Sequence, residues 1–353
     1  MKKTIKVILL ILSAIVVFAA AFVILLTVTE YRPDDVESVS VVTDGETAEQ
    51  GVGTVRIVTW NIGYCGLGAG ASFILDGGEG NGSPESEEIL SEYYTGIKQT
   101  LSTLDADILL LQEVDSDSSR SYGFDEVSAL QSDLGLTSSA YALNYSCPFV
   151  PFPLPPIGKV NSGILTLTDF EISEAQRISL PCPFSWPLRT ANLKRCLLVC
   201  RIPISGSDRE LVVVNLHLEA YDDGGGKEAQ TKMLLKILEE EHEAGNYVIA
   251  GGDFNQTFPG SLDTWQIKNA GYWTPGVLDR SSLAEGWCFA YDDMLPTCRL
   301  LNQPYDPDDP LTQYYVIDGF ILSPDVELIS VETIDADFSY SDHNPVLIEI
   351  VLS

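Results

Sequence analysis

The stretch YVIAGGDFN, residues 247–255, is the most informative of the short motifs in this chain. An apolar run, Tyr247–Ala250, leads into two glycines and then into Asp253 and Asn255. Glycines let the backbone turn tightly at the end of a buried strand, which then presents two short polar side chains. The aspartate can accept a proton from an attacking water and the asparagine amide can bind a phosphoryl oxygen. A plain Asp/Asn turn is the competing interpretation.

Five further clusters show the same pattern, in which an apolar, β-branched run ends in polar residues. They are Thr59-Trp60-Asn61, Leu111-Gln112-Glu113, Asn215-Leu216-His217, Ile317-Asp318-Gly319 and Ser341-Asp342-His343. A sheet would deliver these groups one after another to a common rim, where a site can be assembled. Two of the three histidines fall inside the clusters, and the third, His242, lies among glutamates and is interpreted as a surface residue.

The clusters contain hard oxygen ligands and proton-carrying groups. Glu113 follows an aliphatic strand and suits Mg²⁺ or Mn²⁺ as a ligand, and Asn61 can hydrogen-bond such a carboxylate. Viewed alone, Glu113 is more simply a charged strand cap and Asn61 a turn residue. A carboxylate such as Asp342 or Asp318 can orient the His343 imidazole and keep it protonated beside phosphate.

From Thr54 onward, short β-rich runs alternate with two amphipathic stretches. Mixed strands and helices without a linker after residue 54 predict one α/β domain over residues 54–353. The expected strands are Val55–Trp60, Ile108–Gln112, Ser162–Leu167, Cys196–Ile202, Leu211–Leu216, Tyr247–Ala250, Tyr314–Leu322 and Val346–Val351, and the expected helices are Glu87–Leu104 and Lys227–Glu243. Pro148–Pro156 and Asp306–Pro310 are expected to be loops.

The N-terminus predicts a membrane segment. Three lysines within the first six residues precede the apolar run Val7–Val28, which is long enough to cross a hydrocarbon core of about 30 Å. We expect residues 1–29 to be a retained signal-anchor, with the rest of the chain on the extracytoplasmic side of the cell membrane. Cleavage near Ala19–Ala21 followed by secretion is the alternative. Residues 30–53 are acidic and rich in Ser, Thr and Gly, which is typical of a flexible spacer.

The charge of the chain bears on its partners. The net charge is −31, and beyond residue 29 there are 17 basic against 51 acidic residues. Such an exterior repels a long polyanion and disfavours nucleic acid as a partner, although an acidic surface also serves solubility alone. The seven cysteines include no CxxC pair, which argues against a structural zinc site. In an oxidising compartment Cys182 could bridge to Cys196 or Cys200, and Cys288 to Cys298.

Taken in order, the six clusters resemble those of the endonuclease/exonuclease/phosphatase superfamily, the deoxyribonuclease I-like fold, from about Val55 to the C-terminus. The resemblance implies a four-layered α/β sandwich of two packed, mainly antiparallel or mixed sheets flanked by helices, with the site at one sheet edge. It also implies hydrolysis of phosphoesters with a divalent metal, Mg²⁺ in the first place and Mn²⁺ or Ca²⁺ as alternatives.

The resemblance also implies roles for individual residues. Glu113 is the expected principal metal ligand, with Asn61 and Asp342 close to the metal. The expected catalytic residues are Asp253 to activate water, Asn255 to bind phosphate, His217 and His343 to stabilise the charge of the pentacovalent state, and Asp318 as a supporting acid. Substrate contacts are expected from Tyr145, Asn161, Lys194 and Arg195, where the chain departs from the family pattern and the two basic residues could equally flank a surface strand.

The sequence therefore predicts a membrane-tethered phosphoester hydrolase, a phosphodiesterase acting on a lipid headgroup or another small phosphodiester. The apolar segment Phe149–Leu154 could approach a lipid, with a packed Pro-rich loop as the alternative. A nuclease on the extracytoplasmic side and an inactive binding module of the same fold are the competing hypotheses.

Overall fold

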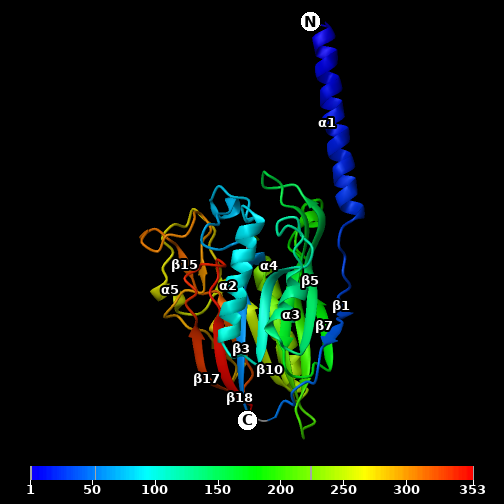
Figure 1. Cartoon of the computed structure of the whole chain (residues 1–353). Coiled ribbons are helices and arrows are strands. Elements are labelled where there is room, and N and C mark those ends of the chain that lie inside the picture. The colour runs from blue at the N-terminus through cyan, green and yellow to red at the C-terminus, as the bar shows by residue number, and fades with distance from the viewer. Residues whose placement is uncertain (1, 52, 223–224, 353) are drawn as a thin grey trace.

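The computed structural model describes residues 2–51, 53–222 and 225–352, and contains two seven-stranded mixed sheets (Figure 1). The first sheet, in spatial order, is β1 (Val36–Ser38), β7 (Glu174–Ser179), β8 (Cys196–Pro203), β9 (Glu210–His217), β10 (Tyr247–Asp253), β16 (Asp318–Leu322) and β13 (Cys288–Ala290). The second is β17 (Val326–Thr333), β18 (Val346–Leu352), β3 (Thr54–Asn61), β4 (Ile108–Asp115), β6 (Gly158–Thr168), β5 (Ser138–Val150) and β2 (Val41–Thr43).

Shorter elements complete the fold. Two small sheets pair β11 (Gln256–Thr257) with β12 (Gly276–Val277) and β14 (Cys298–Arg299) with β15 (Tyr314–Tyr315). The helices are α1 (Lys2–Val28), α2 (Glu87–Thr103), α3 (Glu126–Leu134), α4 (Gly225–Glu243) and the single turn α5 (Ser261–Thr264). Four 3₁₀ turns are η1 (Gly63–Cys65), η2 (Ile74–Asp76), η3 (Leu188–Ala191) and η4 (Arg280–Ser282).

The two large sheets pack face to face because successive strand residues point to opposite sides. Ile57 of β3 and Val213 of β9 belong to the apolar cluster between the sheets. Val58, the next residue of β3, instead packs with α2 and α3 on the outer face of the second sheet. Leu234 of α4 packs with the outer face of the first sheet. These helix–sheet–sheet–helix layers confirm the predicted four-layered α/β sandwich.

One predicted strand is divided between two sheets. The run Tyr314–Leu322 forms β15 and β16, and Val316 and Ile317 lie between them. The backbone leaves the strand there because the Ile317 carbonyl accepts a hydrogen bond from Phe254 N, at 2.9 Å, and its N–H donates to Thr297 Oγ1, also at 2.9 Å. β15 then pairs with β14, whereas β16 pairs with β10 and β13.

The prediction that residues 30–53 form a flexible spacer is wrong for the residues that the structure describes. β1 and β2 lie in this segment and form an edge strand of each large sheet, pairing with β7 and β5. Ala48 and Gln50 make further bridges to Phe170 and Ile204. An edge strand is held by main-chain hydrogen bonds, which need no apolar pattern in the sequence. The segment therefore ties both sheets together.

The disulfides that the sequence left open do not form, since all seven cysteines are free thiols. Cys196 and Cys200 of β8 are buried in an apolar cluster, while Cys182 lies in an exposed loop. Cys288 lies on the edge strand β13, and Cys298 is buried in the small sheet β14–β15. Folding thus carries the members of each expected pair to different environments.

The N-terminal helix α1 projects from the domain as a long, isolated rod (Figure 1). Its stretch Lys3–Val28 is long and apolar enough to cross a membrane, and most of its side chains are exposed. The helix touches the domain at its C-terminal end: Leu26 is buried, and the Phe22 ring packs edge-on against Phe149 with centroids 6.0 Å apart. The structure thus contains a candidate membrane anchor that is joined to the domain by packing as well as by the chain.

Candidate active site

Strand register brings three of the sequence clusters into one row. β9 and β10 run parallel with His217 opposite Asp253, and β10 and β16 run antiparallel with Asp253 opposite Asp318. In the second sheet, β3 and β4 run parallel and place Asn61 opposite Gln112. The polar ends of β9, β10, β3 and β4 therefore meet at one edge of the sandwich, as the strand-end pattern predicts.

Gly252 allows the close approach that this row requires. A Cβ atom at Gly252 would lie 1.9 Å from the Leu216 carbonyl oxygen, and its φ of 154° is one that side-chain-bearing residues rarely adopt. Gly252, the residue directly before Asp253, thus allows β10 and β9 to lie in close contact. That contact sets Asp253 directly beside His217.

Asp253 is the centre of the site. Its Oδ2 accepts a hydrogen bond from Asn61 Nδ2 at 3.1 Å and lies 3.3 Å from His217 Nε2. Its Oδ1 accepts from the backbone N–H of Asn255 at 2.8 Å. Burial, together with the nearby Asp318 carboxylate, raises the pKa of Asp253 to about 6. A carboxylate with that pKa is able to take up a proton near neutral pH.

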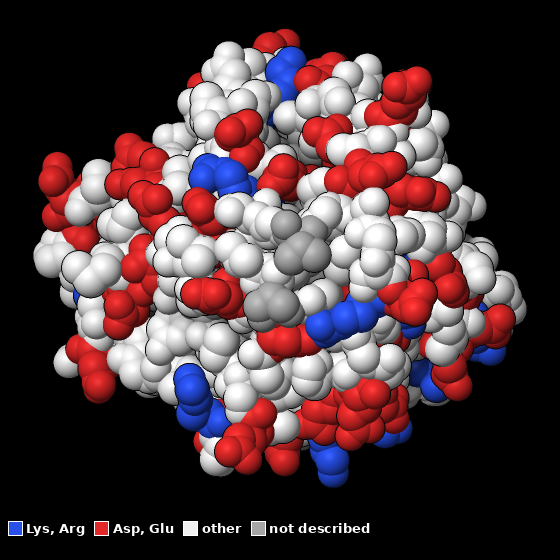
Figure 2. Space-filling model, turned by 90° about the horizontal axis from the view of Figure 1, so that it is seen from below, with Lys and Arg blue, Asp and Glu red and all other residues white. Residues whose placement is uncertain are grey.

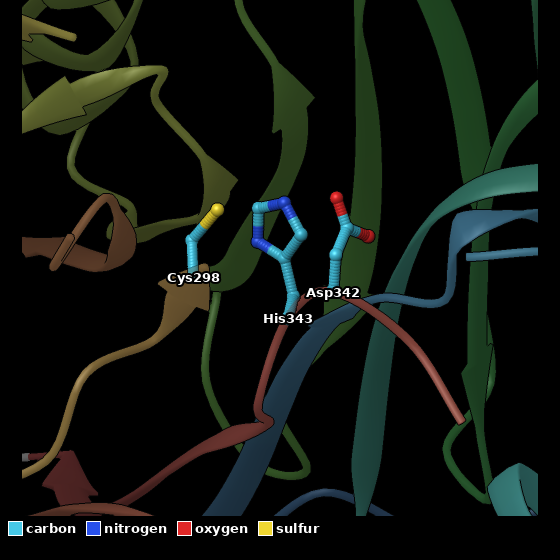
Figure 3. A group of neighbouring side chains, drawn as sticks. All are labelled: Cys298, Asp342 and His343. Atoms are coloured by element: carbon cyan, nitrogen blue, oxygen red, sulfur yellow. The ribbon is translucent and has the colours of Figure 1, made fainter. Parts of the chain in front are cut away.

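His343 lies between two carboxylates. Its Nδ1 lies 2.8 Å from Asp318 Oδ2, and its Nε2 lies 3.8 Å from Asp253 Oδ2. Burial alone would lower the pKa of this imidazole, but the charge and hydrogen bond of Asp318, together with smaller contributions from Cys298 and Asp342, outweigh burial and hold the pKa well above its usual value. The His343 ring also lies between Cys298 and Asp342 (Figure 3). The site therefore holds a protonated imidazole oriented by Asp318.

His217 is the complementary, neutral imidazole. Burial, reinforced by the positive charges of Arg195 and His343, holds its pKa well below the usual value. Its Nε2 faces Asp253 at 3.3 Å and Glu113 at 3.9 Å. Its Nδ1 is buried without a hydrogen-bond partner among the described residues. A neutral ring can donate from Nε2 to an anionic oxygen while it remains uncharged.

Glu113 and Asp342 form the acidic side of the site. Glu113 lies at a bulge of β4, where the register with β6 shifts between Leu111 and Val114, and its φ is +54°. Asn61 Nδ2 donates to Glu113 Oε1 at 3.3 Å. Burial, with a further contribution from Glu113, raises the pKa of Asp342 to about 7. Asn61, Glu113 and Asp342 line one cavity, and carboxylate and amide oxygens are the donors that a hard divalent cation prefers, so the chemistry of these residues fits a metal.

Gln112 and Asn215, the other polar residues of the clusters that contain Glu113 and His217, hydrogen-bond to each other within the sandwich. Gln112 Nε2 donates to Asn215 Oδ1 at 2.9 Å, and Asn215 Nδ2 donates to the carbonyls of Leu111 and Leu165. This bond joins the two sheets directly beneath Glu113 and His217. The polar clusters of the sequence therefore contain residues that hold the two sheets together as well as residues that line the site.

The expected site residues line a cavity of about 500 Å³. Those on its wall are Asn61, Glu113, Tyr145, Arg195, His217, Asp253, Asn255, Asp342 and His343. Asp318 stands behind His343 rather than on the wall. Asn255 Nδ2 also donates to the Leu218 carbonyl at 2.9 Å, which fixes the orientation of its amide.

Two expected substrate contacts do not lie on the cavity wall. Asn161 hydrogen-bonds Ser146 and the main chain of Asp117 on the other side of β6, and its neighbour Ser162 lines the cavity. Adjacent strand residues point to opposite faces, so only one of the two can face the site. Lys194 lies 3.5 Å from Glu30 and likewise points away, while Arg195 lines the cavity.

Arg195 is buried beside the catalytic row with unused hydrogen-bond donors. Its Nε and one terminal nitrogen have no hydrogen-bond partner among the described residues, and the nearest carboxylate oxygen, on Glu219, is 3.9 Å away. Asn144 Nδ2 is buried and unpartnered in the same wall. Together these donors form a cationic, hydrogen-bonding surface suited to an anionic oxygen.

Several wall residues have no signal in the sequence. Arg120 makes two hydrogen bonds to Asp115, at 2.9 and 3.0 Å, and stacks 3.4 Å from the centre of the Tyr64 ring. Asp76 accepts a hydrogen bond from Tyr221 at 2.9 Å, and burial raises its pKa to about 6. The four wall residues among these are Tyr64, Asp76, Arg120 and Tyr221. They come from loops or turns, and the periodicity of strands or helices in the sequence gives no indication of where such residues lie.

Comparisons with known proteins agree with this geometry. The sequence profile of the Endonuclease/Exonuclease/phosphatase family matches residues 58–343, whereas no protein with a curated description matches the chain. Among solved structures, an endonuclease/exonuclease/phosphatase from Beutenbergia cavernae superposes with a TM-score of 0.57 at 16% identity, covering 85% of this chain and 72% of the other. The 2′,3′-cyclic phosphatase ANGEL2 gives 0.51 at 16% identity, covering 89% of this chain and 98% of the other.

The catalytic domain of human Nocturnin, solved with a bound sulfate anion, gives a TM-score of 0.51 at 18% identity, covering 89% of this chain and 97% of the other. At these identities the superpositions establish the fold, and the matched profile, which spans most of the chain and all six clusters, establishes the family. The protein belongs to the endonuclease/exonuclease/phosphatase family.

Proposed function

We propose that this protein is a metal-dependent phosphodiesterase that hydrolyses a lipid headgroup or another small phosphodiester at the extracytoplasmic face of the cell membrane. The observation that carries the proposal is the convergence of Asp253, His217, His343 and Glu113 on one cavity from four different strands or loops. Metal-assisted attack of water on phosphorus requires a base, a charge-stabilising donor and a hard ligand, and these residues supply all three.

Each residue has a role that follows from its surroundings. Glu113, Asp342 and Asn61 would hold the divalent cation, Mg²⁺ in the first place, which when bound supplies Lewis-acid neutralisation of phosphoryl oxygens. Asp253 accepts a proton from the attacking water, and its raised pKa of about 6 suits that task. His343, kept protonated by Asp318, donates to an equatorial phosphoryl oxygen as negative charge develops there.

His217 and Asn255 complete the binding of phosphate. Neutral His217 donates through Nε2, and the Asn255 amide is held in place by the Leu218 carbonyl. Arg195 and Asn144 lie farther along the wall with unused donors, where a second anionic or polar group of the substrate would bind. Removal of either histidine is expected to raise the barrier for the chemical step rather than to prevent binding.

The charge of the exterior favours a small substrate over a polyanion. Seen from the end opposite α1, Asp and Glu are spread over the surface and outnumber Lys and Arg (Figure 2). Nucleic-acid binding relies on cations that neutralise many phosphates, and the whole chain beyond residue 29 has only 17 basic against 51 acidic residues. A nuclease is therefore the less supported reading of the same catalytic groups.

The proposal is tested with the full chain in detergent micelles and a panel of phosphoesters with Mg²⁺, Mn²⁺ and Ca²⁺. The panel contains bis(p-nitrophenyl) phosphate, p-nitrophenyl phosphate, choline- and ethanolamine-headgroup lipids, and plasmid DNA. We expect metal-dependent turnover of the diesters and lipids. Turnover of DNA alone at physiological salt would replace the proposed substrate with nucleic acid, and no turnover of any ester with any of the three metals would point to a binding module.

Glu113→Gln tests the role of the acidic side of the site. It removes one negative charge with little change of shape, so we expect calorimetric binding of Mn²⁺ to weaken and turnover to fall at least about a hundredfold. The matched control is Glu327→Gln, an exposed glutamate on β17 far from the cavity. Unchanged metal binding and turnover in Glu113→Gln would overturn the metal site.

A further inference from the structure

An apolar rim lies beside the cavity at the end of the domain where α1 leaves it. We define the apolar rim as five exposed residues: Phe149 near the end of β5, Phe152 and Leu154 in the β5–β6 connection, and Trp186 and Leu188 just before and at the start of η3. Leu154 is 79% exposed and Leu188 66%. Large apolar side chains that gather on one exposed edge mark an interaction surface.

The rim is continuous with the anchor helix. Phe22 of α1 packs against Phe149, and Trp186 donates a hydrogen bond from its indole nitrogen to Thr27 Oγ1 at 3.0 Å. Glu30, just after the helix, lies 3.2 Å from Arg189 and 3.5 Å from Lys194. The helix end is thus held to the end of β5 by packing and to the segment around η3 by a hydrogen bond and ion pairs.

The helix also forms part of the cavity wall. Val23 and Leu26 of α1 line the same cavity as Asp253 and His343, together with Phe152 and Leu188 of the apolar rim. An apolar wall of helix and loop therefore leads down to the polar catalytic row. Such a gradient suits a molecule with an apolar tail and a polar, phosphorylated head.

The length of the helix sets the depth of the rim in a membrane. About 30 Å of hydrocarbon, counted from Val7 at about 1.5 Å per residue, ends near Leu26. The contacts of Phe22 and Thr27 with the domain lie within about one helical turn of that boundary. Phe149 and Trp186 then take the interfacial position that aromatic side chains favour. The cavity mouth opens at the level of the lipid headgroups.

We propose that the domain rests on the bilayer that carries α1, with the apolar rim immersed at the interface and the cavity opening into the headgroup layer. The substrate is then a membrane lipid that reaches the site along the wall formed by α1, without leaving the bilayer. This proposal rests on the proposed phosphodiesterase function for its chemistry, but the seating of the rim is an independent physical claim. The acid-rich face in Figure 2 lies at the opposite end, away from the membrane.

The seating is tested without any activity. The full chain with Cys182→Ser, which removes the exposed thiol, receives Leu154→Cys and is labelled with the environment-sensitive fluorophore NBD. After reconstitution into phosphatidylcholine vesicles, we expect blue-shifted emission that is lost when doxyl-labelled lipid is included. The matched control is Ile329→Cys in the same background, since Ile329 is 51% exposed on β17, at the end of the domain remote from α1 (Figure 1).

The outcomes are distinct. Quenching at position 154 and not at 329 supports the seating. Quenching at neither position, or equally at both, overturns it, because the domain then stands clear of the bilayer or lies on it without a preferred face. Neither result depends on turnover, so a failure of the proposed function would leave this measurement intact.

A second measurement joins the seating to catalysis. Leu154 lies outside the cavity wall, so Leu154→Asp is expected to keep turnover of soluble bis(p-nitrophenyl) phosphate unchanged. Turnover of lipid in vesicles is expected to fall about tenfold, because a charge at the interface resists insertion. Equal turnover of vesicle lipid by both proteins would show that the substrate reaches the cavity through water instead.

Discussion

His343 Nδ1 lies 2.8 Å from Asp318 Oδ2, and the opposite nitrogen of the same ring faces Asp253 at 3.8 Å. One buried carboxylate thus sets the charge and the orientation of an imidazole that acts beside another carboxylate. The arrangement gives two aspartates different tasks: Asp318 keeps His343 protonated, whereas Asp253 can receive a proton.

Asp318→Asn tests this separation. The amide keeps the shape of the side chain but cannot hold His343 protonated, so we expect kcat to fall by about two to four orders of magnitude with little change in KM. The ¹⁵N chemical shifts of His343 should report a neutral ring near pH 7 in the variant and a protonated ring in the parent. A variant ring that stays protonated would contradict the role given to Asp318.

The pH dependence of turnover should follow Asp253. Burial raises its pKa to about 6, and a base acts only when it is deprotonated, so kcat/KM is expected to rise with pH through about 6 and then to level off. The measurement is a pH profile with bis(p-nitrophenyl) phosphate at saturating metal. An acid limb near pH 4 would indicate that the site does not impose the raised pKa during turnover.

Arg195→Ala is expected to raise KM for an anionic or zwitterionic lipid about tenfold while kcat changes less, because the guanidinium lies on the cavity wall with free donors but outside the catalytic row. Lys194→Ala is the control from the neighbouring position, since Lys194 pairs with Glu30 away from the cavity. Equal effects of the two substitutions would indicate a general electrostatic contribution instead of a specific contact.

Gly252→Ala should destabilise the fold. The new Cβ would lie 1.9 Å from the Leu216 carbonyl oxygen, so β9 and β10 must separate, and we expect a loss of about 3 kcal/mol or more in the free energy of unfolding. Gly51→Ala is the control, because no atom lies within 4 Å of a Cβ there. Denaturant unfolding of both variants provides the comparison, and equal stability would show that the strands can part without cost.

Asp76 offers a test on stability alone. Burial raises its pKa from 3.8 to about 6, so the unfolded chain releases the proton more readily, and stability declines as the pH rises from about 4 to about 6. Asp76→Asn keeps an oxygen that accepts from Tyr221 and carries no charge. We expect the variant to be more stable by about 2–3 kcal/mol at pH 7.5 and equal to the parent at pH 4, where Asp76 is protonated.

The strand-end clusters were predictable because they depend on local rules. An apolar strand that ends in a polar residue delivers that residue to the sheet edge whatever the details of packing, so Asp253, His217 and Asn61 converge as expected. The same alternation explains why Asn161 lies off the cavity wall, since the direction of a strand residue depends on a register that sequence alone does not fix.

The remaining features depend on contacts between distant segments. β1 and β2 carry no apolar pattern, because an edge strand needs only main-chain partners, here β7 and β5. Arg120 and Asp76 reach the cavity from turns, where they contact Tyr64 and Tyr221. The periodicity of the sequence does not indicate where these turns lie, so only the structure identifies Arg120 and Asp76 as cavity residues.

The position of the contacts on α1 bears on the two alternatives for the N-terminal segment, retention as an anchor and cleavage near Ala19–Ala21. Every described contact between this helix and the catalytic unit comes from Phe22 onward, after the small residues Ala19–Ala21. A peptidase that cut there would remove most of the bilayer-crossing segment and leave the residues from Phe22 onward, which include the cavity-lining Val23 and Leu26. Shedding would change where the enzyme works while leaving its catalytic compartment assembled.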